Sequence, residues 1–163
     1  MLHAAPGEFD HYVALQEGDS MSQGPDTISF VSAVPQFTVP DLVRTAEYYR
    51  DVLGFQIAGY WDGERVSFAT DPPPVFAIVW RDQVQVFFSR ADQADVRTRR
   101  AEDAPDAYLR VIGIDALAEE LRTRGAEILD GPEDRIYGQR ELLVKDCNGL
   151  ILCFGEDTSG RAT

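Results

Sequence analysis

Two segments of this 163-residue chain repeat one pattern: an extended run, then an Asp, a helical stretch and a closing Gly. In the first segment the run ends at Val39, and Asp41 is placed to cap a helix over 42–53. Gly54 follows, and glycine suits the left-handed position that commonly ends a helix. Because residues 106–125 repeat the pattern, we expect a fold built from two copies of one unit.

Extended stretches complete each unit. The predicted strands are 34–39, 55–61, 75–81 and 83–90 in the first unit, and 106–111, 126–129, 137–145 and 150–155 in the second. In the second unit, Asp115 is placed to cap the helix and Gly125 to end it. The segment from Asp146 to Gly149 predicts a hairpin turn between the last two strands. Strand, helix and three strands, in this order and twice, predict an α+β fold.

Alternation along each strand assigns its side chains to two faces of a sheet. In the first strand, the side expected to face a helix-covered core carries Pro35, Phe37 and Val39. The opposite side carries Val34, Gln36 and Thr38. Since one helix covers only one face of the sheet in each unit, the other face must form a cavity or meet a partner.

The chain divides by composition into a domain and two flanking segments. The predicted division is a polar, acidic N-terminal extension at 1–29, a domain at 30–156 and a C-terminal tail at 157–163. Within the domain, module one covers 30–90, a linker covers 91–105 and module two covers 106–156. Two alternatives concern the extension: Met21 as the natural start, and an ordered arm from Phe9 to Leu15 that packs on a partner.

The formal net charge of -13 indicates which kinds of molecule the protein can bind. Residues 1–29 carry five acids and no Lys or Arg, and residues 30–156 carry 22 acids and 14 bases. This charge argues against DNA, RNA or an anionic membrane as partner and permits a cationic ligand; the alternative is that it serves only solubility. No apolar run has the length of a membrane span and no secretory signal opens the chain, so we expect a cytoplasmic protein.

Histidine and cysteine limit the chemistry of the domain. His3 and His11 both precede it, so it cannot hold a Ser-His-Asp or Cys-His catalytic set. Cys147 and Cys153 are predicted to be free thiols of a reducing compartment, with a disulfide between them as the alternative.

Five landmarks in order carry a family resemblance. They are Ala33-Val34-Pro35, the step from Val39 to Leu42, and the stretches Tyr49 to Phe55, Val111 to Leu117 and Tyr137 to Asp146. Over residues 33–156 the chain resembles the vicinal oxygen chelate superfamily, which contains glyoxalase I, extradiol dioxygenases, fosfomycin-resistance enzymes and bleomycin-binding proteins. The resemblance implies two tandem βαβββ modules in a curved, roughly eight-stranded mixed sheet, with a concave cavity face and helices on the outer face.

Within the superfamily, the chain is most similar to the bleomycin-resistance type. Pro35 in the first strand and the stretch from Tyr137 to Glu141 match that type. The last hairpin departs from it, with Cys147 where a Pro is common and Leu150 where an Asn is common.

The resemblance also locates the metal-ligand positions. Metal-dependent members hold a divalent ion with His and Glu side chains from four strands. Those positions match Val34, Phe87 (or Gln85, if the register slips by two), Asp106 and Cys153. Val34 and Phe87 have no donor atom, and one carboxylate with one thiol makes a poor site for a hard divalent ion. We therefore expect no metal, no cofactor and no catalytic residue of the family's type.

The strand parity of these positions identifies the concave face. The predicted ligand-binding residues on it are Gln36, Thr38, Gln85, Phe87, Asp106, Tyr108, Arg110 and Cys153, with Ser89 and Ile151 beside them. Aromatic, amide and charged groups together are typical of a small-molecule pocket. The structural alternatives are that Phe87 fills the core and that Asp106 and Arg110 pair with each other or with Glu141.

Three functions remain open. The leading prediction is a metal-independent binding protein that sequesters a cationic or planar ligand, such as a bleomycin-like antibiotic, as a homodimer with grooves between the subunits. The second is a lyase, isomerase or dioxygenase with a rebuilt site around Asp106, Tyr108, Arg110 and Cys153. The third is an interaction protein whose dimer or N-terminal arm matters more than any pocket.

Overall fold

The computed structural model describes residues 32–91 and 104–159. Module one contains β1 (Gln36–Val39), α2 (Leu42–Asp51), β2 (Gln56–Trp61), β3 (Val66–Ser67), β4 (Phe76–Arg81) and β5 (Val84–Arg90). Module two contains β6 (Ala107–Arg110), α3 (Ile114–Thr123), β7 (Glu127–Asp134), β8 (Gln139–Lys145) and β9 (Ile151–Asp157). The predicted N-terminal extension, nearly all of the linker and the end of the tail lie outside the described residues.

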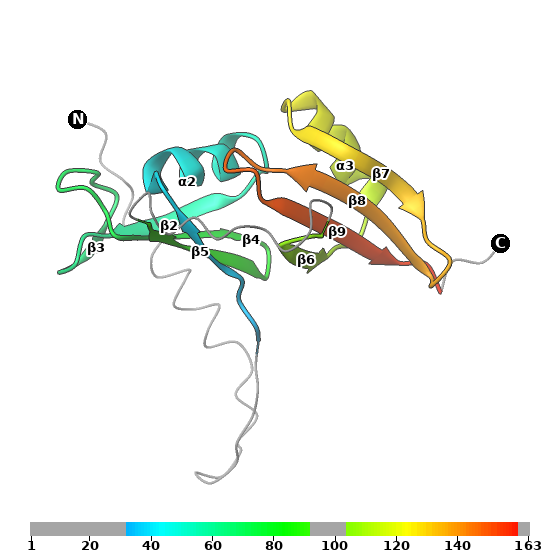
Figure 1. The fold of residues 1–163 in the computed structure, drawn as a ribbon, viewed down its shortest axis with the longest axis horizontal. Coiled ribbons are helices and arrows are strands. Elements are labelled where there is room, and N and C mark those ends of the chain that lie inside the picture. Colours follow the sequence, from blue (N-terminus) through cyan, green and yellow to red (C-terminus); the bar gives the residue numbers. More distant parts are fainter. Residues whose placement is uncertain (1–31, 92–103, 160–163) are drawn as a thin grey trace, which may run out of the picture.

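The two modules share one topology. Their sheets have the strand orders β1-β5-β4-β2-β3 and β6-β9-β8-β7, and the first strand of each module pairs in parallel with the last. Figure 1 shows the modules side by side, with α2 against β2, β4 and β5, and α3 against β7, β8 and β9. The predicted α+β fold of tandem βαβββ modules is confirmed, and its strands form two separate mixed sheets.

The two helices begin in different ways. Asp41 caps α2 as predicted, because its Oδ1 accepts the Arg44 backbone N–H at 3.0 Å. The prediction that Asp115 caps α3 is wrong: Gly113, at φ 83°, holds the cap position and has no side chain to offer. Instead, Oε2 of Glu156, on β9, accepts the Ile114 N–H at 2.9 Å. The acceptor at this helix start therefore comes from a strand 42 residues later in the chain.

Strand β7 runs past the predicted end at residue 129. It stays paired with β8 as far as Asp134 through register shifts on either side of Asp130. Gly131 is required there, because its φ is 86° and a Cβ would overlap the Glu141 carbonyl oxygen of β8. The turn-like sequence at 130–132 is thus a bulge within the strand.

One buried core joins the modules. Tyr49 on α2 is fully buried and meets the rings of Phe88 and Phe55 edge-on at centroid distances of 4.9 and 5.6 Å. Val39 lies in the same core while Gln36 and Thr38 are exposed, as the alternation predicts. The β8–β9 turn extends this core into module two, since the Tyr49 hydroxyl lies 3.4 Å from Oδ2 of Asp146.

Among the described residues, no helix is long and apolar enough to cross a membrane.

Candidate functional site

Four of the predicted ligand-binding residues share the face of the first sheet that α2 leaves uncovered. They are Gln36, Thr38, Gln85 and Phe87. Gln36 lies directly opposite Phe87 in the parallel β1–β5 pair, and its Nε2 donates to the Ser89 hydroxyl at 2.7 Å. Phe87 does not fill the core, which takes its neighbour Phe88 instead.

Strand β4 adds apolar side chains to this face. Phe76, Ile78 and Trp80 lie opposite Ser89, Phe87 and Gln85 in the antiparallel β4–β5 pair. The Phe76 and Phe87 rings meet edge-on at 5.4 Å, and Trp61 on β2 lies beside Phe76 and is 38% exposed. We call the set Trp61, Phe76, Trp80 and Phe87, with Gln36 and Gln85, the aromatic face. Phe76 was missed from the sequence, although it shares the strand parity of Trp80.

The second sheet places Tyr108 opposite Cys153 in the parallel β6–β9 pair. Tyr108 is 44% exposed, and its hydroxyl donates to the Gln139 side-chain oxygen at 3.4 Å. The ring lies over Gly155, where a Cβ would overlap the hydroxyl. Glycine at this position therefore allows the ring to lie across the sheet.

Three other predicted residues have structural contacts. Asp106 accepts the Ile151 backbone N–H at 2.7 Å and so holds the start of β9. Arg110 lies 3.8 Å from Asp157 in an exposed ion pair. Cys153 is buried, and burial raises the pKa of its thiol to about 11, which leaves it protonated at neutral pH. Cys147 is likewise a free thiol and its pKa is raised by burial.

Glu141 on β8 is a buried carboxylate that the predicted set does not include. It is 7% exposed, and its Oε2 accepts the Tyr137 hydroxyl at 2.8 Å and Nε of Arg135 at 3.4 Å. Burial, together with the Glu141 carboxylate, raises the pKa of Tyr108 to about 12. The Tyr137 hydroxyl therefore donates to Glu141, whereas the Tyr108 hydroxyl donates to Gln139 and feels the Glu141 carboxylate through its raised pKa. The burial of Glu141 depends on the pairing of β7 with β8 beyond residue 129. The sequence did not predict this pairing, because residues 130–132 resemble a turn.

The metal-ligand positions of the second sheet do not fit a divalent ion. Asp106 supplies a single carboxylate, whose Oδ2 accepts the Ile151 N–H, and Cys153 presents a protonated thiol. Phe87, on the first sheet, has no donor atom. Within 32–91 and 104–159, no group of three or more His, Cys, Asp or Glu side chains is arranged to hold a metal ion.

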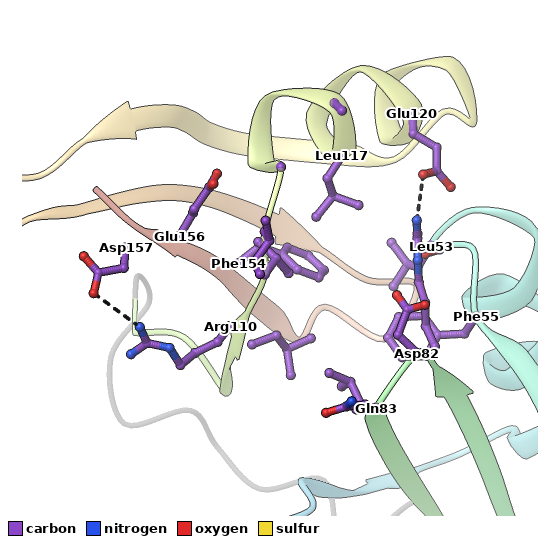
Figure 2. A pocket seen from close by; sticks show the side chains of 17 residues that line it. Leu53, Phe55, Asp82, Gln83, Arg110, Leu117, Glu120, Phe154, Glu156 and Asp157 are labelled. Carbon is purple, nitrogen blue, oxygen red and sulfur yellow. Dashed lines mark hydrogen bonds and ion pairs between the residues drawn. The ribbon is translucent and has the colours of Figure 1, made fainter. Parts of the chain in front are cut away.

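A cavity of about 980 Å³ lies between the modules, on the side of α3. Figure 2 shows Leu53 and Phe55 of module one facing Leu117 and Phe154 of module two across it. Of the eight predicted ligand-binding residues, only Arg110 lines this cavity. The aromatic face lies elsewhere, on the helix-free side of the first sheet.

Each sheet also has an edge strand from the start of its module. β1 pairs only with β5, and β6 only with β9, within the part of the chain that the structure describes.

A family model supports the resemblance in sequence. The model described as Glyoxalase/Bleomycin resistance protein/Dioxygenase superfamily matches residues 28–154. No curated protein matches the chain.

Solved structures share the fold at low sequence identity. TioX from Micromonospora sp. ML1 is 18% identical, with a TM-score of 0.58, over 78% of this chain and 99% of that one. The antibiotic binding protein TnmS3 from Streptomyces sp. CB03234 is 20% identical, with a TM-score of 0.55, over 80% and 99%. The bleomycin-binding protein from bleomycin-producing Streptomyces verticillus, complexed with copper(II)-bleomycin, is 24% identical, with a TM-score of 0.55, over 82% and 99%. At these identities the likeness shows the fold alone.

Proposed function

We propose that this chain, which belongs to the Glyoxalase/Bleomycin resistance protein/Dioxygenase superfamily, is a metal-independent binding protein that sequesters a cationic or planar small molecule, such as a bleomycin-like antibiotic. One observation carries the proposal: the helix-free side of the first sheet presents half-buried aromatic rings beside amide side chains. Rings stack on planar ligands, and amides fix their orientation by hydrogen bonds.

The charge of the chain agrees with a cationic ligand. A net charge of -13 attracts cations and raises their rate of encounter with the protein. The same charge disfavours nucleic acid as a partner. Two proteins of the same fold, TnmS3 and the Streptomyces verticillus protein, are described as binding an antibiotic and bleomycin, respectively. Their ligands support the proposal that this chain binds a ligand of the same class.

A homodimer belongs to the proposal. Helix α2 leaves the aromatic face uncovered, and within the described residues β1 and β6 each lie at an edge of their sheet. A second copy that brings its β6 sheet to the β1 edge would place Tyr108 and Arg110 opposite the aromatic face and close a groove between subunits. In the same proposal the protein acts in the cytoplasm, where its two free cysteines would stay reduced.

The enzyme alternative relies on Asp106, Tyr108, Arg110 and Cys153, and these groups give it little support. The pKa of Tyr108 is about 12 and that of Cys153 about 11, so neither is a base or nucleophile at neutral pH. Oδ2 of Asp106 accepts the Ile151 backbone N–H, which gives this residue a structural role at the start of β9.

The test is thermal unfolding with and without metal-free bleomycin, in the presence of a chelator. Ligand at about 100 times its dissociation constant stabilises the folded state by about 2.7 kcal/mol, which raises the melting temperature by several degrees. A saturable rise supports sequestration without metal. The absence of any rise up to millimolar ligand rejects bleomycin as the ligand.

A further inference from the structure

The duplicated fold brings a hairpin turn of each module against the helix of the other. The β8–β9 turn packs closely on α2: the Asn148 amide donates to the Thr45 hydroxyl at 3.0 Å, and the Arg44 guanidinium donates to the Cys147 carbonyl at 3.4 Å. Polar side chains thus fill the first of the two equivalent interfaces.

Among residues 32–91 and 104–159, no side chain fills the second interface. The β4–β5 turn, at Asp82 and Gln83, faces α3, and Arg81 joins them at one edge by an ion pair with Glu120 at 2.7 Å. Both residues of this pair line the cavity of about 980 Å³, which Figure 2 shows from close by. Small-molecule sites are typically clefts of roughly 300–1,000 Å³, so the space suits a ligand.

Both modules supply the apolar wall of the cavity. It is formed by Leu53, Phe55, Val84, Val111, Leu117 and Phe154. These side chains come from segments on either side of the module boundary, so an occupant would contact both modules at once. A molecule that bridges them would stabilise the folded chain.

The charges at the rim favour a cation. Four carboxylates and two guanidiniums line the cavity. Arg81 is already bound to Glu120 and to the Leu53 carbonyl, and Arg110 faces Asp157. Asp82 is exposed and makes no hydrogen bond or ion pair with any residue that the structure describes. The uncompensated charge of the cavity is therefore negative.

We propose that the cavity between the modules is a second binding site, separate from the aromatic face, for a cationic amphiphile: a small molecule with an apolar body and one ammonium-type group. The apolar body lies between Leu117 and Phe55, and the ammonium group lies against the Asp82 carboxylate. This site does not depend on the ligand proposed for the aromatic face, so either assignment can fail alone.

The test is NMR titration of the ¹⁵N-labelled full chain with amantadine, a compact aliphatic cage amine that cannot stack on aromatic rings. Adamantane-1-carboxylate is the matched anion. The expected result is a saturable shift of the Val84 and Gly113 amides with the amine and not with the carboxylate. The amides of Gln36 and Phe87, on the aromatic face, should stay in place.

Three variants sharpen the test. Asp82→Asn should fold normally, because Asp82 has φ 53° and asparagine tolerates left-handed backbone; its affinity for amantadine should fall about three- to fivefold, as for one exposed charge pair. Ala116→Trp, at an exposed helix position that lines the cavity, should abolish the shifts. Phe87→Ala should leave the affinity unchanged.

Several outcomes would overturn the proposal. They are equal shifts with the carboxylate, shifts confined to the aromatic face, no shifts at millimolar amine, or an affinity that Ala116→Trp leaves intact. Shifts of Val84 and Gly113 that follow protein concentration without any amine would show that a second copy of the chain fills the cavity instead.

Discussion

The ring of Tyr108 lies across Gly155 of the neighbouring strand, so close that a Cβ at Gly155 would overlap the tyrosine hydroxyl. Gly155→Ala should therefore push the ring off the sheet and lower the free energy of unfolding by about 1–3 kcal/mol, as overpacking does. Urea denaturation measures the loss. In Tyr108→Ala the same glycine substitution should cost much less, and equal costs in both backgrounds would contradict the contact.

Glu141 and Tyr108 are coupled electrostatically. Burial and the Glu141 carboxylate hold the pKa of Tyr108 at about 12, so Glu141→Gln should lower that pKa towards its ordinary value of 10.0. Titration of the tyrosine ¹³Cζ signals by NMR measures the change. A Tyr108 pKa that Glu141→Gln leaves unchanged would contradict the coupling, and Glu127→Gln, on the neighbouring strand, serves as the control.

Arg81 links the modules through one partly buried guanidinium. It donates to the Leu53 carbonyl at 2.8 Å and to Glu120 at 2.7 Å. Arg81→Ala should lower the free energy of unfolding by about 1–3 kcal/mol, because two charge-assisted bonds are lost and the Leu53 carbonyl is left without this donor. The matched control is Arg122→Ala, whose exposed pair with Glu119 at 3.6 Å should be worth less than about 0.5 kcal/mol. Equal losses in the two variants would argue against the link.

Asp146 makes stability depend on pH in an unusual direction. It is 4% exposed, and burial raises its pKa above the ordinary 3.8, although its Oδ1 accepts the N–H groups of Asn148 and Leu150. Since the folded state then holds this proton more tightly than the unfolded state, the contribution of Asp146 to stability falls as pH rises above 3.8.

Asp146→Asn keeps an oxygen for both N–H groups and removes the titration. Its stability relative to the unsubstituted chain should rise as the pH is raised from about 3.8 towards neutrality. Urea unfolding of both proteins across this range gives the difference. A difference that is flat, or that falls with pH, would contradict the raised pKa.

Short sequence patterns predicted those features of the fold that depend on residues close together in the chain. Asp41 caps α2 through a residue three positions away, so its role is visible in the chain itself. The start of α3 is not, because Glu156 supplies the acceptor from another strand. Asp115 has the right residue type for a cap, but it lies within the first turn and bonds Arg140.

The candidate site likewise has one part that the sequence predicted and one part that it could not predict. Strand alternation placed Gln36, Gln85 and Phe87 on the helix-free face, since alternation is a local property. The cavity between the modules could not be predicted, because Leu53 and Phe154 line the same cavity only through packing of one module on the other. Both residues are apolar, which predicts that they are buried but not which residues they face.

The proposed function requires that the aromatic face binds the ligand without metal. Calorimetric titration can test this with metal-free bleomycin and a chelator, on the unsubstituted chain, Phe87→Ala and the exposed-turn control Ile136→Ala. We expect saturable binding to the unsubstituted chain and the control, and binding about tenfold weaker in Phe87→Ala, as the loss of one ring stacking contact implies. Equal affinity in all three proteins, or binding only after a divalent metal is added, would contradict the claim.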